Sequence, residues 1–225
     1  MTLRGTKPLT PLPEGHGQQS ALAQLATFIP EPNHQSHNAL TAQLVLIRAS
    51  GQPDLRLQDL RKDWQSSRYL HIRVDGLYLN GTLSLSAALN QQGILTENCP
   101  VRAMNYIDID HRHPSAALLW LTKKVSEGCG VLVNLEVNDV PALKHIYTTL
   151  AQQPDSGHTV IVVGIHRDNL GRVLSLDVLD PALNPPTQRL PVDDFMIAWL
   201  YRGFAAAATV APLPQAPRRS MQNFG

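Results

Sequence analysis

The sequence has few of the residues that would tie it to a membrane, to nucleic acid or to a disulfide framework. It holds two cysteines in 225 residues, Cys99 and Cys129, so a disulfide scaffold is not indicated. No apolar run approaches the roughly 18 to 20 residues of a membrane span, and the first residues lack the apolar core of a signal peptide. The formal net charge is +1 without a block of like charges, so no clustered Lys/Arg face is available for phosphates. We therefore expect a cytoplasmic protein that binds no nucleic acid; export without a cleaved signal is an open alternative.

One domain of ordinary size fits between two proline-rich ends. Residues 1–17 contain three prolines and three glycines and are expected to form an irregular leader. Residues 211–225 are proline-rich and polar, with little to bury, and are expected to be disordered. Residues 18–210 are long enough to bury a core of their own.

The hydrophobic period changes along this domain from helical to extended. Apolar residues at helical spacing come first, and near-continuous or alternating apolar runs follow. Helices before an antiparallel sheet predict an α+β fold. The expected helices are 20–28, 38–49, 57–64, 84–91, 114–126, 141–152 and 193–201, and the expected strands are 69–74, 130–137, 159–165 and 173–179.

The most informative segment is GHTVIVVGIHRDNLGRVLSLDVLD, a predicted hairpin of two strands. His158 opens the first strand, and Asp180, followed by Pro181, closes the second. At adjacent strand ends a carboxylate can hold one imidazole nitrogen and leave the other as a base. Asp177 competes for the carboxylate role, but in a regular strand it points to the face opposite Asp180.

This segment, together with the following RLPVDDFMIAW, resembles the double-glycine-leader peptidases of bacteriocin exporters, within the papain-like cysteine peptidases. The stretch from Gly81 to Arg102 is similar to another segment of that superfamily. The resemblance implies a papain-like fold, with a helical N-terminal half packed on a twisted antiparallel sheet. It also implies that His158 is the base and Asp180 its orienting partner.

The same resemblance implies a nucleophilic cysteine at the first turn of the first core helix, with an oxyanion-stabilising glutamine shortly before it. The matching segment, GHGQQSALAQLA, has Gln19 or Ser20 at the nucleophile position and Gln18 at the oxyanion position. Ser20 is either a nucleophile or the N-cap of the helix that it begins. Cys99 and Cys129 are also candidates, although cysteines are often inert packing residues. Of these two, Cys129 is preferred, because a Gly-Cys-Gly turn would leave its sulfur accessible.

Other chemistry has weaker support. Asp108, Asp110, His111 and His113 could place two imidazoles on one face of an extended segment, but no second ligand cluster accompanies them, so a solvated loop is expected. We expect no cofactor and no metal.

Two functions remain open. The chain is either a degenerate papain-like peptidase domain that binds a peptide or protein partner, or an active cysteine or serine peptidase or acyl-transferring hydrolase. The second function would use His158 and Asp180, with Ser20 or Cys129 as nucleophile. The oligomeric state is not predicted.

Overall fold

A computed structural model describes residues 24–30, 38–60, 73–74, 77–78, 82–101, 112–137, 140–144, 146–147 and 157–214. Its centre is a six-stranded sheet in the order β3-β8-β4-β5-β6-β7, in which every neighbouring pair is antiparallel. The strands are β3 (Thr96–Asn98), β4 (Val131–Glu136), β5 (Gly157–Arg167), β6 (Val173–Leu179), β7 (Thr187–Pro191) and β8 (Ala206–Thr209). A separate two-stranded sheet pairs β1 (Arg73–Val74) with β2 (Leu77–Tyr78).

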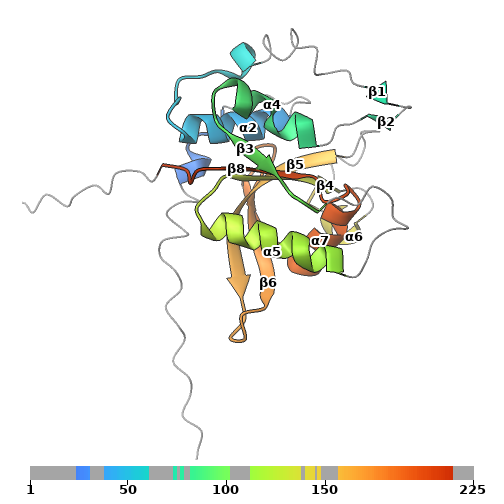
Figure 1. The fold of residues 1–225 in the computed structure, drawn as a ribbon. Coiled ribbons are helices and arrows are strands. Elements are labelled where there is room, and N and C mark those ends of the chain that lie inside the picture. Colours follow the sequence, from blue (N-terminus) through green and yellow to red (C-terminus); the bar gives the residue numbers. More distant parts are fainter. Residues whose placement is uncertain are drawn as a thin grey trace, which may run out of the picture.

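Helices cover both faces of the large sheet (Figure 1). One face carries α2 (Asn38–Ala49) and α4 (Thr82–Gln91), and the other carries α5 (Arg112–Ser126) and α7 (Val192–Leu200). The short α6 (Pro141–Lys144) follows β4. No helix in the described ranges is long and apolar enough to cross a bilayer.

Successive side chains of the central strands point to opposite faces of the sheet, and this divides the hydrophobic core into two clusters. In β4, Val131, Val133 and Leu135 pack toward α5 and α7, and Leu132 packs toward α2 and α4. All six residues of β4 are buried, because neither face of this strand meets water. The strand begins with a run of three apolar residues, and its two polar residues, Asn134 and Glu136, are also buried.

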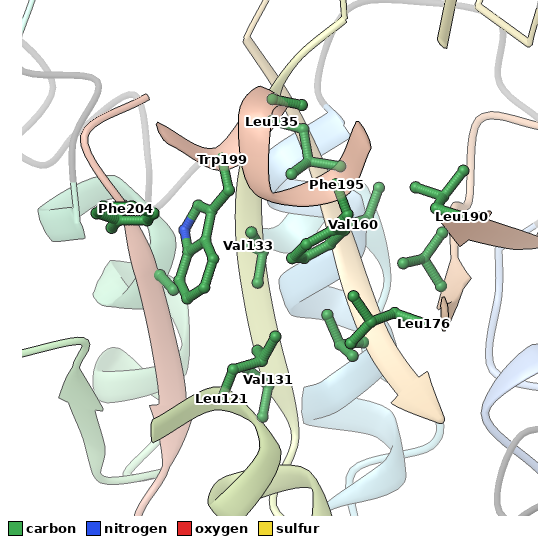
Figure 2. Packing of buried hydrophobic residues seen from close by; sticks show 14 of the residues in the cluster. Leu121, Val131, Val133, Leu135, Val160, Leu176, Leu190, Phe195, Trp199 and Phe204 are labelled. Atoms are coloured by element: carbon green, nitrogen blue, oxygen red, sulfur yellow. The ribbon is translucent and has the colours of Figure 1, made fainter. Parts of the chain in front are cut away.

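Three aromatic residues hold α7 on its face of the sheet (Figure 2). Trp199 lies between Phe195 and Phe204, with ring centroids 5.9 and 5.2 Å away. Its indole Nε1–H donates to the carbonyl of Ala205 over 3.1 Å, which satisfies the polar atom of a fully buried ring. Phe204 adopts a positive φ of 58°, rare for a residue with a side chain, and this turns its ring back onto Trp199.

Most predicted elements are confirmed where the structure describes them. The predicted helix over 38–49 and the strand over 173–179 have the expected bounds, and the helices over 84–91, 114–126 and 193–201 differ by one or two residues. The α+β composition with an antiparallel sheet is also confirmed. Three further predicted segments are described only in part. Residues 24–26 of the predicted helix 20–28 and residues 57–60 of the predicted helix 57–64 are helical, and residues 73–74 of the predicted strand 69–74 form β1. Residues 20–23, 61–64 and 69–72 of these segments lie outside the described ranges.

The prediction of a helix over 141–152 is wrong in length, because α6 ends at Lys144 and the chain forms a turn at residues 146–147. Tyr147 is buried against the sheet, a tertiary contact that outweighs helix propensity. The sequence analysis also missed four strands: β2 in the small sheet, and β3, β7 and β8 in the large one. The alanine-rich β8 has no strand-like pattern, and only its position between β3 and β4, buried throughout, makes it a strand.

The described chain continues to residue 214. Leu213 N–H donates to the carbonyl of Gly128 over 2.9 Å, and the Leu213 side chain packs against the cluster beneath α2. The rest of the predicted tail, residues 215–225, lies outside the described ranges, as does the predicted leader.

Replacing Trp199 by alanine should lower the free energy of unfolding by about 3 to 5 kcal/mol, because it removes a fully buried ring and leaves a cavity. Urea denaturation followed by circular dichroism would measure the loss. Leu119→Ala is the matched control: its side chain is 71% exposed on α5, so its effect should stay within about 0.5 kcal/mol. Equal effects of the two substitutions would contradict the packing in Figure 2.

Candidate functional site

His158 is the second residue of β5, directly opposite Leu135 in β4. Strand alternation puts its side chain on the same face as Val160 and Val162, the face covered by α5 and α7. The imidazole is almost completely buried, with 4% of the side chain exposed.

Asp180 follows β6 directly and is fully buried. The β5–β6 register pairs Ile161 with Leu179, so Asp180 comes level with Val160 and is a diagonal neighbour of His158. Its Oδ1 accepts the N–H of Ala182 over 2.9 Å, which fixes the turn after the strand. One carboxylate oxygen of Asp180 thus binds the backbone of the turn, and the other contacts the His158 imidazole.

The structure brings the two predicted side chains together: Nε2 of His158 contacts Oδ2 of Asp180. A proton on Nε2 would be donated to the carboxylate, and Nδ1 would then carry the basic lone pair. The arrangement can therefore orient an imidazole as a base, or serve only as a satisfied polar pair inside the core.

Tyr147 is a third member of this cluster, which the sequence analysis did not identify. Its ring lies 4.8 Å from the His158 ring, tilted by 57°, and it is fully buried. Its buried hydroxyl lies near the carboxylate of Asp180. Burial, and then the negative charge of Asp180, raise the pKa of Tyr147, so the phenol stays neutral. Tyr147 lies eleven positions before His158, and no local pattern marks it.

Cys129 does not lie beside His158. It precedes β4 at the end opposite Leu135, the residue that pairs with His158. The stretch from Val131 to Leu135 alone spans about 13 Å, and Cys129 lies two residues further away. The expectation of an accessible sulfur is also wrong, because Cys129 is only 6% exposed; burial chiefly raises the pKa of its thiol and disfavours the thiolate.

Cys99 is equally remote. Its N–H donates to Ala206 in β8, so three strand spacings, about 14 Å, separate it from β5. These two cysteines are the only ones in the sequence. The other candidates, Ser20 and Gln18, lie outside the described residues, as do Asp108, Asp110 and His111. Within the described ranges, no group of three or more His, Cys, Asp or Glu side chains could hold a metal ion.

A second histidine–aspartate pair lies on the opposite face of the sheet. Asp177 accepts hydrogen bonds from Arg189 Nε, over 2.8 Å, and contacts Nε2 of His166 over 2.6 Å. Asp177 thus points away from Asp180, as strand alternation predicts. A Cβ at its β5 neighbour Gly164 would come within 3.1 Å of the Asp177 carboxylate, so glycine makes room for it. The sequence analysis did not single out His166; its position near the end of the predicted hairpin was the available signal.

Comparison with known proteins supports the fold but assigns no family. No protein-family model matches the sequence, and no curated protein matches it significantly. Solved structures do match, among them a crystal structure from Bacillus anthracis with a provisional description as a C39-like peptidase. The TM-score is 0.51 at 14% identity, over 83% of this chain and 96% of the other. The chain therefore has a mixed helix and antiparallel-sheet fold similar to that of a C39-like peptidase.

A double-mutant cycle would measure the interaction between His158 and Asp180. We expect a coupling free energy of about 1 to 3 kcal/mol from His158→Ala, Asp180→Ala and the double variant, because each single change leaves a buried polar partner uncompensated. Chemical denaturation of the four proteins gives the value. Strict additivity of the two single effects would show that the pair does not interact in solution.

Stability should depend on pH through Asp177. Burial opposes ionisation of this carboxylate, but hydrogen bonds from Arg189 and His166 outweigh it, so its pKa is lowered in the folded chain. The stabilisation is therefore present above the unfolded pKa of about 3.9 and is lost as pH falls through the folded value.

Asp177→Asn should accordingly cost about 1 to 3 kcal/mol at neutral pH, and the difference from the parent chain should shrink below about pH 4. Denaturation series at several pH values would measure it. Asp54→Asn, in the exposed loop after α2, is the control and should show no such trend. A cost that is independent of pH would contradict the ionic character of the cluster.

Proposed function

We propose that this chain is a peptidase-like domain that binds a peptide or protein segment and does not perform thiol catalysis. The observation that carries the proposal is the distance of both cysteines from the His158–Asp180 pair. A general base must lie within about 2.6 to 3.2 Å of the group that it deprotonates. Cys99 and Cys129 are separated from His158 by at least about 13 Å of sheet, and both are buried.

The surroundings of His158 also support a structural role for the pair. The imidazole, the carboxylate and the ring of Tyr147 are all nearly inaccessible to solvent. Asp180 binds the backbone of the following turn as well as the histidine. A buried, hydrogen-bonded pair of this kind can be retained because removing one partner leaves the other unsatisfied.

Peptide recognition follows from the fold similarity. The Bacillus anthracis protein is described as a peptidase, and a peptidase fold has to accommodate an extended polypeptide. A chain with this fold but without a usable thiol could still bind such a segment. We therefore assign a peptide or protein segment as the ligand class.

A second function, hydrolysis with a hydroxyl nucleophile, is favoured by one observation, the retained contact between His158 and Asp180. That contact would orient Nδ1 as a base toward a serine, and Ser20 is the candidate from the sequence. Ser20→Ala is the variant that addresses it.

The experiment presents a randomised peptide mixture to the immobilised chain and follows retention and cleavage by mass spectrometry. A fluorophosphonate and a thiol-reactive probe are applied in parallel, with His158→Ala and Ser20→Ala as controls. We expect a defined subset of peptides to be retained intact, and no labelling that depends on His158. Cleavage or labelling lost in His158→Ala would replace the binding proposal with the hydrolase, and absence of any retention would refute it.

A further inference from the structure

Two exposed features of the molecule have complementary chemistry: the tip of the β5–β6 hairpin, residues 167–172, and an apolar groove between α5 and α7. We propose that the hairpin tip of one copy docks in the α5–α7 groove of a second copy, so that the chain self-associates head to tail. This proposal uses surfaces away from His158 and does not depend on the proposed function.

The hairpin tip is held rigidly by Asp168. Its Oδ1 accepts the N–H groups of Leu170 and Arg172, each over 2.9 Å, and its Oδ2 accepts Nε–H of Arg172 over 2.6 Å. Arg167 closes the turn further, since its Nη1 donates to the carbonyl of Gly171 over 2.8 Å. A turn ordered in advance loses little conformational freedom when it binds.

This turn presents a leucine to solvent. Leu170 is 80% exposed at the tip, and Leu174, further along the hairpin, is 53% exposed. The guanidinium groups of Arg167 and Arg172 are exposed beside them. Figure 1 shows that the hairpin extends past α5, so the tip can enter a surface on another molecule. The tip is therefore an apolar projection with a basic margin.

The α5–α7 groove offers the opposite chemistry. It has a volume of about 330 Å³ and an apolar floor, and Ile197 is 46% exposed within it. Asp193 and Asp194 occupy the first turn of α7, and Asp193 lines the groove. Neither carboxylate forms an ion pair with any other described residue. The residues that line the groove are Pro114, Asp193, Met196, Ile197, Leu200 and Phe204.

Burial of apolar surface and opposite charges both favour binding of the hairpin tip in the α5–α7 groove. Leu170 would leave water by entering the groove, and Arg167 and Arg172 would come close to Asp193 and Asp194. The tip and the groove are different patches of the same chain, so the contact is heterologous, and each copy can bind two others. Self-association should therefore continue beyond a dimer as concentration rises.

Sedimentation velocity over a wide concentration range tests the proposal. The parent chain should show a mass that rises with concentration. Leu170→Asp and Ile197→Arg should each weaken association at least about tenfold, because one places a charge on the apolar tip and the other places a like charge opposite the basic margin. Leu95→Asp is the control: its leucine is 71% exposed just before β3, away from both patches, and it should associate like the parent.

Mixing the two variants gives the decisive result. Leu170→Asp retains an intact groove, and Ile197→Arg retains an intact tip, so together they should form a 1:1 complex that does not grow. Circular dichroism of each variant establishes that it is folded. A parent chain that stays monomeric at every concentration, variants that associate as the parent does, or a mixture that stays monomeric would each overturn the proposal.

Discussion

The large sheet is covered by helices on both faces, and this constraint governs which residues the central strands can contain. Neither side of β4 or β5 meets water over most of its length, so a polar side chain there needs a partner. Two histidine–aspartate pairs meet this need for the histidines of β5. His158 contacts Asp180 beneath α5 and α7, and Asp177 contacts His166 and Arg189 on the other face.

These two histidine–aspartate pairs differ in what they can do, although one hairpin supplies both. The His158 pair is closed off by the ring of Tyr147 and holds a turn in place. The His166 pair is partly exposed, with 36% of the imidazole side chain accessible, and carries an arginine. Burial favours a fixed, structural arrangement, whereas the exposed pair remains open to solvent.

Apolar side chains remain exposed at two places on the described surface, the hairpin tip and the α5–α7 groove. Leu170 is 80% exposed on an ordered turn, so it adds little to packing among the described residues. In the self-association proposed above, it would leave water on entering the groove of a second copy.

The sequence by itself determined the features that depend on near neighbours along the chain. Period and turn residues identified the β5–β6 hairpin, and two-residue alternation put Asp180 and Asp177 on opposite faces. Only the tertiary structure decided that Tyr147 covers His158, that Cys129 lies at the far end of β4, and that the alanines of β8 form a buried strand. Those features depend on strand order and on how separate elements pack together. No local pattern encodes them.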